Sequence, residues 1–71
     1  MLEKSVFGIF HQIMDVKEVA ELMGVHKRTI YRMANEGQMP AFKFGGRWRF
    51  EEKTLINWIN QEMIKNYGNL Q

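Results

Sequence analysis

The fold is decided by residues 14–37, which read MDVKEVAELMGVHKRTIYRMANEG. Asp15 and Glu18 stand three residues apart, the spacing of a capping box, in which each side chain accepts a hydrogen bond from the other residue's backbone N–H. They predict a helix that begins at Asp15 and ends at Gly24, since glycine readily takes the left-handed conformation that stops a helix. Its apolar residues recur at helical spacing and are Val16, Val19, Ala20 and Met23.

A second helix is predicted over residues 27–36, with Gly37 as its stop. Ile30, Met33 and Ala34 form its expected buried face. Three residues, 24–26, separate the two helices. A short turn that contains glycine, between two short amphipathic helices, is typical of a helix-turn-helix. The sequence therefore predicts this motif over residues 15–36.

Residues 41–50 read AFKFGGRWRF and predict a β-hairpin around the two glycines. A two-residue loop would pair Phe44 with Arg47, whereas a three-residue loop would pair Phe44 with Trp48. We predict the longer loop because it places all four aromatic residues on one face and Lys43 with Arg49 on the other. The four aromatic residues are Phe42, Phe44, Trp48 and Phe50.

The 71 residues allow one domain. A final helix is predicted over residues 51–65, with Leu55, Trp58, Ile59 and Met63 as its core stripe. The expected fold class is mainly α with a small β-hairpin, in the order helix, helix, two-stranded antiparallel wing, helix. This domain covers residues 14–65, followed by a short tail at 66–71. The apolar leader at 1–13 fits a short helix, a strand or a partner-binding arm.

Basic residues are concentrated in the middle of the chain. Residues 26–50 hold six basic residues and one acid, a balance of +5, whereas the flanks hold four basic and seven acidic residues, a balance of −3. A layout of this kind presents one positive face to a polyanion while the rest of the surface stays solvated. The charge distribution therefore favours a nucleic-acid partner, although a solvated charged surface explains charge alone equally well.

The composition argues against several other classes of protein. Cysteine is absent, which excludes disulfides and thiolate metal sites, and favours a cytoplasmic location. His11 and His26 have no convincing nucleophile or ligand spacing near them, so we expect no enzyme, no metal and no cofactor. The apolar runs are too short to span a bilayer, and no membrane partner is expected.

Residues 14–59 resemble the excisionase-type, MerR-like winged helix-turn-helix domains. The matching segments are MDVKEVAELMGVHKRTIYRMANEGQMPAFKFGGRWRF and LINWI. The resemblance includes a small residue in the first helix, a glycine at the turn and an aliphatic residue in the second helix, here Ala20, Gly24 and Ile30. The family usually has Ser or Thr where this chain has His26, which leaves two interpretations: His26 caps the second helix, or it faces DNA.

The resemblance implies a recognition helix in the major groove and a basic wing on the DNA backbone or in the adjacent minor groove. Arg28 is the first choice for base reading and Arg32 the second, because a guanidinium can bridge O6 and N7 of guanine. Lys17 is a weaker candidate for a backbone contact. The predicted DNA-binding residues are Lys27, Arg28, Thr29, Tyr31, Arg32, Lys43, Arg47 and Arg49.

Two kinds of factor use such a domain, excision factors that act beside an integrase and small regulators that act on the transcription machinery. A single domain of this size should bury only about 600–1,000 Å² on DNA, so we expect cooperative self-association through the leader or the tail. The alternative is a protein-interaction adaptor that uses the leader and the final helix. An adaptor does not need a net charge of +5 concentrated on one helix and the wing. The charge distribution therefore favours DNA binding over the adaptor.

Overall fold

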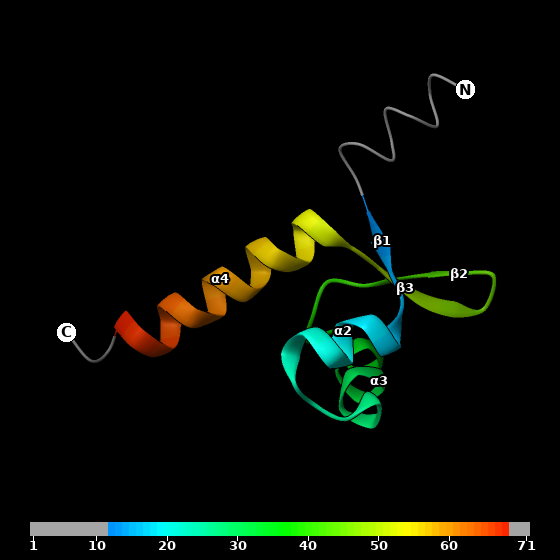
Figure 1. Cartoon of the computed structure of the whole chain (residues 1–71), viewed down its shortest axis with the longest axis horizontal. Coiled ribbons are helices and arrows are strands. Elements are labelled where there is room, and N and C mark those ends of the chain that lie inside the picture. Colours follow the sequence, from blue (N-terminus) through cyan, green and yellow to red (C-terminus); the bar gives the residue numbers. More distant parts are fainter. Residues whose placement is uncertain (1–11, 69–71) are drawn as a thin grey trace, which may run out of the picture.

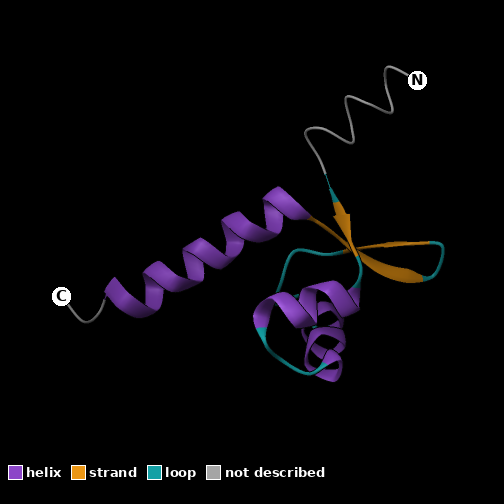
Figure 2. Cartoon of the chain, in the orientation of Figure 1, coloured by secondary structure: helices purple, strands orange, loops and turns teal. Residues whose placement is uncertain are grey.

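The computed structural model describes residues 12–68. Helices α2 and α3 pack together, the β2–β3 hairpin projects to one side and α4 projects to the other (Figures 1 and 2). This arrangement confirms the predicted winged helix-turn-helix, mostly helical with a small antiparallel hairpin. Most of the leader (residues 1–11) and the end of the tail (69–71) lie outside the described residues. The elements are β1 (Ile13–Met14), α2 (Val16–Met23), α3 (Lys27–Asn35), β2 (Phe42–Phe44), β3 (Arg47–Glu51) and α4 (Glu52–Gly68).

Helix α2 has the predicted signals at both ends. The capping box is formed, with Glu18 N donating to Asp15 Oδ1 at 2.8 Å and Asp15 N donating to Glu18 Oε1 at 2.9 Å. At the other end Gly24 takes φ 69°, and the next N–H, that of Val25, donates to Ala20 O at 3.0 Å. These bonds satisfy backbone groups that the helix itself leaves without partners, so both ends of α2 are set by local sequence.

Helix α3 is capped by His26, which decides between the two interpretations of this residue in favour of a cap. The imidazole Nδ1 accepts a hydrogen bond from Arg28 N at 3.1 Å. The helix ends at Asn35, one residue earlier than predicted, because Glu36 already has the non-helical angles φ −90° and ψ 2°. Gln38 N then donates back to Met33 O at 2.8 Å across Gly37, which fixes the exit of the chain toward the hairpin.

One core joins the helices to the sheet. Ile30 of α3 and Phe50 of β3 are both fully buried and belong to the same cluster. Met14, Trp48 and Trp58 are partly buried and pack against this cluster. The buried residues are Val16, Val19, Ala20, Ile30, Ala34, Met39, Phe50 and Leu55.

The hairpin has a two-residue loop, and the predicted three-residue loop is wrong. Phe44 pairs with Arg47, and Lys43 pairs with Trp48. Gly45 and Gly46 both have positive φ, at 62° and 78°, as the tight type I′ turn requires. The prediction failed because it chose the loop length that places all four aromatic residues on one face. Phe42 and Phe44 instead share a face with Arg47 and Arg49, and Lys43 shares the other face with Trp48.

Strand β1 adds a third strand, in the order β1-β3-β2, that the sequence analysis left among the options for the leader. Ile13 pairs with Glu51 and Met14 with Phe50. Helix α4 begins at Glu52, one residue later than predicted, because Glu51 still belongs to β3 and caps the helix, accepting from Thr54 N at 2.9 Å. The helix continues to Gly68, three residues beyond its predicted end, so residues 66–68 of the expected tail are helical.

The described part of the chain contains neither a membrane-crossing helix nor a metal-binding cluster. Over residues 12–68 no helix combines the length and the apolar character needed to cross a bilayer. The same residues contain no group of three or more His, Asp or Glu side chains placed to bind a metal ion.

Candidate nucleic-acid interface

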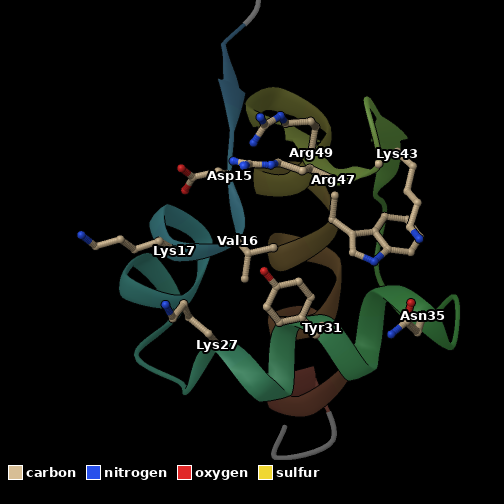
Figure 3. Close-up of a pocket in the computed structure, with 11 residues that line it drawn as sticks. Asp15, Val16, Lys17, Lys27, Tyr31, Asn35, Lys43, Arg47 and Arg49 are labelled. Atoms are coloured by element: carbon tan, nitrogen blue, oxygen red, sulfur yellow. The ribbon is translucent and has the colours of Figure 1, made fainter.

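A groove of about 550 Å³ runs between α3 and the hairpin, which we call the wing (residues 42–51). Figure 3 shows Tyr31 rising from α3 toward the wing, with Arg47 and Arg49 above it. Residues from α2 and from its N-cap close one end of the groove. The groove therefore joins three parts of the fold that are separate in the sequence. Its lining consists of Asp15, Val16, Lys17, Lys27, Tyr31, Asn35, Lys43, Gly46, Arg47, Trp48 and Arg49.

The charge of this groove is strongly positive. Five cationic side chains line it against a single carboxylate, that of Asp15. The Asp15 carboxylate is already engaged as the N-cap of α2, through Glu18 N at 2.8 Å. Clustered cations attract a polyanion because their potentials add across the surface. The cationic residues are Lys17, Lys27, Lys43, Arg47 and Arg49.

Helix α3 contributes to the groove through residues four apart, which share one helical face. These are Lys27, Tyr31 and Asn35. The neighbouring face carries Arg28 and Arg32, which are exposed and do not line the groove. The face of α3 that carries the arginines is therefore free to meet a surface larger than the groove itself.

The eight predicted DNA-binding residues thus fall into two sets. Five of them line the groove, and Arg28, Thr29 and Arg32 do not. Arg32 Nη1 lies 3.3 Å from Glu36 Oε1 in an exposed ion pair, and Thr29 is half-buried. The five residues of the groove are Lys27, Tyr31, Lys43, Arg47 and Arg49.

One groove lysine is held by an aromatic ring. Lys43 Nζ lies 5.1 Å from the centroid of the Trp48 ring, within the range of a cation–π contact. The ring itself packs against the core. Trp48 therefore contacts the core through its packing and Lys43 through a cation–π contact.

Comparison with known proteins places this architecture in a family. Residues 13–63 match a protein family described as a helix-turn-helix domain. The chain belongs to this helix-turn-helix family. The match confirms the resemblance inferred from residues 14–59.

Two curated proteins from two strains of Mycobacterium tuberculosis resemble this helix-turn-helix domain. Each is 41% identical over 48 residues, which cover 68% of this chain and 62% of the relative. Both are named as candidate DNA-binding proteins. The chain thus aligns with less than two thirds of the length of these relatives. No solved structure matches the chain.

The sequence analysis missed Asn35 in this helix-turn-helix domain and gave Lys17 little weight. Asn35 lines the groove one turn beyond Tyr31. The signal that could have found it is the four-residue spacing from Lys27 through Tyr31. The position of Lys17 at the groove does not follow from the sequence, because it depends on how α2 packs beside the wing.

Proposed function

We propose that this chain is a binding protein, not an enzyme, that recognises specific sequences in double-stranded DNA. The observation that carries the proposal is the convergence of five cationic side chains from α2, α3 and the wing on one groove beside the exposed face of α3. The relatives named as candidate DNA-binding proteins support it. Because phosphate contacts dominate affinity for DNA, such a surface should bind a duplex tightly at low salt and weakly at high salt.

In this proposal α3 enters the major groove with its exposed face toward the bases. Arg28 is the principal base-reading residue, since its exposed guanidinium can donate two hydrogen bonds to one guanine. Arg32 lies one turn further along the same face and pairs with Glu36 at 3.3 Å. An exposed ion pair contributes about 1 kcal/mol or less, so DNA can displace it at little cost. Arg32 is therefore the second base-reading residue.

Residues at the rims of α3 would bind phosphates and fix the position of the helix in the groove. Lys27 and Tyr31 lie on the wing side, and the Tyr31 side chain is 47% exposed with its hydroxyl at the groove. Thr29 lies at the opposite rim, half-buried. These contacts would carry little sequence information, so they add affinity for every duplex.

The wing would follow the DNA backbone into the adjacent minor groove. Arg47 belongs to the strand pair next to the turn, which makes it the basic residue nearest the tip. A narrow minor groove has an enhanced negative potential that attracts arginine. Lys43 and Arg49 lie further from the tip and would contact the phosphates on either side. The wing thereby extends the footprint beyond the major groove.

We further propose that several copies assemble on adjacent DNA sites. One such domain buries about 600–1,000 Å² of protein surface, which gives weak binding by a single copy. The far half of α4 exposes Met63, Ile64 and Tyr67, with exposed fractions of 45%, 63% and 59%. These side chains, together with the leader, could contact a neighbouring copy. Sedimentation on duplexes that carry one or two sites tests this: cooperative loading supports it, and tight one-to-one binding to a single site opposes it.

The biological setting has two candidates, transcription regulation and recombination. A regulator would act on the transcription machinery at a promoter, and an excision factor would act beside an integrase. The groove between α3 and the wing serves both, since each needs sequence-specific attachment to a duplex. Mapping the bound sites to promoters or to attachment sites of a mobile element would separate them.

A second candidate function is a protein-interaction adaptor. An apolar groove of about 410 Å³ lies between the end of α2 and the far half of α4, and its apolar lining includes Met23, Trp58, Ile59, Met63 and Tyr67. An adaptor that used this surface would bind its partner without DNA. The concentration of cations in the separate groove between α3 and the wing favours the DNA-binding proposal.

The decisive experiment is selection of bound duplexes from a random DNA pool by the full chain at a stated salt concentration. We expect a short enriched sequence, with affinity that falls steeply as salt rises. A matched variant with Arg28→Ala, Arg47→Ala and Arg49→Ala should enrich nothing. Equal retention of all sequences would contradict specific recognition, and failure to retain any duplex at low salt would contradict DNA binding.

A further inference from the structure

The tip of the wing carries an aromatic side chain that the fold does not use. Phe44 is 73% exposed, the highest value among the exposed large hydrophobic side chains of residues 12–68. It is the last residue of β2, immediately before the turn at Gly45. Phe44 therefore leaves an apolar ring uncovered at the projecting tip, where a ligand that covers it would gain from removing that surface from water.

The same face of the wing carries arginine. Phe44 pairs with Arg47 and Phe42 with Arg49, so each phenylalanine has an arginine as its cross-strand partner on the same face. Trp48 lies on the opposite face and packs against the core. The aromatic residues of the wing therefore have two roles: Trp48 holds the hairpin on the domain, whereas Phe44 faces outward.

The tip is also slender. Gly45 and Gly46 form the whole turn, and the space where a Cβ would stand on either of them has no neighbouring atom within 4 Å. Nothing beyond Phe44 and Arg47 therefore widens the end of the hairpin. The turn therefore places no side chain in front of Phe44 and Arg47, which are the last side chains at the tip.

We propose that Phe44 is a wedge that inserts between two base pairs of duplex DNA from the minor groove, with Arg47 beside it in the groove, and thereby kinks the DNA. The inference rests on the proposed function. Proteins that kink DNA from the minor groove insert apolar side chains between base steps and bend the duplex by about 20–90°. The chemistry of both partners agrees, because the phenyl ring can stack on unstacked bases and the guanidinium is attracted by the groove's negative potential.

The wedge would give the protein a sequence preference at the base step into which Phe44 inserts. This preference would not depend on hydrogen bonds to the bases. Pyrimidine–purine steps unstack most easily, so the step under the wing should be TA or CA/TG. Because Phe44 has no charge, its contribution to affinity should be independent of salt, unlike that of Arg47. These two properties distinguish a wedge from a phosphate contact at the same tip.

The experiment compares the full chain with its Phe44→Ala variant on the duplex selected from the random pool. Bending is measured by energy transfer between dyes at the two DNA ends, and unstacking by a fluorescent adenine analogue placed at successive steps. We expect the wild-type chain to bend the duplex and to raise the emission at one step. Phe44→Ala should lose most of the bend and all of the emission, bind roughly tenfold more weakly, and keep the same salt slope.

Phe42→Ala is the matched control, because Phe42 lies on the same face but further from the tip and is only 44% exposed. It should leave the bend unchanged. A bend that survives Phe44→Ala, or that falls equally in both variants, would overturn the wedge while leaving DNA binding intact. A straight duplex bound by the wild-type chain would do the same. If no duplex is bound, the proposed function itself is wrong, so the two failures are distinguishable.

Discussion

The side chains of Asp15 and Glu18 each accept a hydrogen bond from the other residue's backbone N–H, at 2.8 and 2.9 Å. Asp15 also lines the groove in which five cationic side chains converge. The residue therefore stabilises the first helix while it places a negative charge on the surface proposed to meet phosphates. These two effects can be separated, because a serine hydroxyl also caps a helix but carries no charge.

Asp15→Ser should raise affinity for DNA without loss of stability. Serine and aspartate are similarly good caps, so the free energy of unfolding should change by less than about 0.5 kcal/mol. Removal of the charge should strengthen binding by at most about 1 kcal/mol at low salt. Urea unfolding and fluorescence anisotropy measure the two quantities. Glu21→Gln, which removes a charge outside the groove, should have a smaller effect on affinity; an equal effect would mean that only net charge matters.

His26→Ser should stabilise the domain. The imidazole caps α3 through a 3.1 Å hydrogen bond from Arg28 N, but serine is among the preferred caps and histidine is not. We expect the free energy of unfolding to rise by up to about 1 kcal/mol for Ser and to fall by about 0.5 kcal/mol for Ala. Urea unfolding at neutral pH measures both. If His26→Ala is as stable as the wild-type chain, the hydrogen bond at this cap contributes nothing.

Arg28→Ala should relax the preference at one base pair of the selected site. Loss of a bidentate contact with guanine costs about 1–3 kcal/mol on the preferred sequence. On duplexes substituted at that base pair the loss should be much smaller. Competition binding with single-base variants of the site measures this difference. An equal loss on every sequence would show that Arg28 contacts the backbone.

Arg47→Ala should lower the salt dependence of binding. If the guanidinium neutralises one phosphate, the slope of log affinity against log salt should fall by about one unit. Lys53→Gln is the control, since Lys53 is an exposed cation on α4 that does not line the groove. Anisotropy titrations over a range of salt concentrations give both slopes. An unchanged slope for Arg47→Ala would remove the wing tip from the phosphate contacts.

Gly45→Asn should stabilise the wing, because Asn-Gly is a favoured pair for a type I′ turn and asparagine tolerates positive φ. Reduced freedom in the unfolded chain predicts a gain of about 0.4–1 kcal/mol. Gly46→Val should destabilise it, since φ is 78° at this position and a β-branched residue is strained there. Thermal unfolding measures both changes. Equal stability of the two variants would contradict the two-residue turn.

Much of the helical part of this fold could be predicted from the sequence because its signals are local. The capping box at Asp15 and the left-handed Gly24 each depend on a few neighbouring residues, and both stand where the sequence placed them. The buried Ile30 and Ala34 followed from helical spacing. Such features are readable because backbone hydrogen bonds at helix ends must be satisfied within a short stretch of chain.

The register of the hairpin could not be predicted from aromatic residues alone. Alternation reveals the buried face of a strand only where a core lies against it. Trp48 packs against the core from one face of the wing, whereas Phe42 and Phe44 remain 44% and 73% exposed on the other, so the register does not depend on burying them. The turn decides the register instead, through two glycines that both accept positive φ.

The candidate site could be predicted only in part, because local sequence shows where basic residues cluster but not which of them line the groove. The clustering of basic residues at 27–49 was visible in the sequence, whereas the division between Lys27 in the groove and Arg28 outside it depends on how α3 faces the wing. That orientation is a property of packing between elements. Strand β1 is two residues long, too short to leave a periodic signal.

The direct passage from β3 into α4 has a mechanical consequence. β3 ends at Glu51 and α4 begins at Glu52, so no linker residue separates the hairpin from this helix. Seventeen residues of helix extend about 25 Å at 1.5 Å per residue. A tilt of about 10° imposed on the hairpin would swing the far end of this helix by roughly 4 Å. A molecule bound at the far end of α4 would therefore be displaced when DNA binding tilts the hairpin.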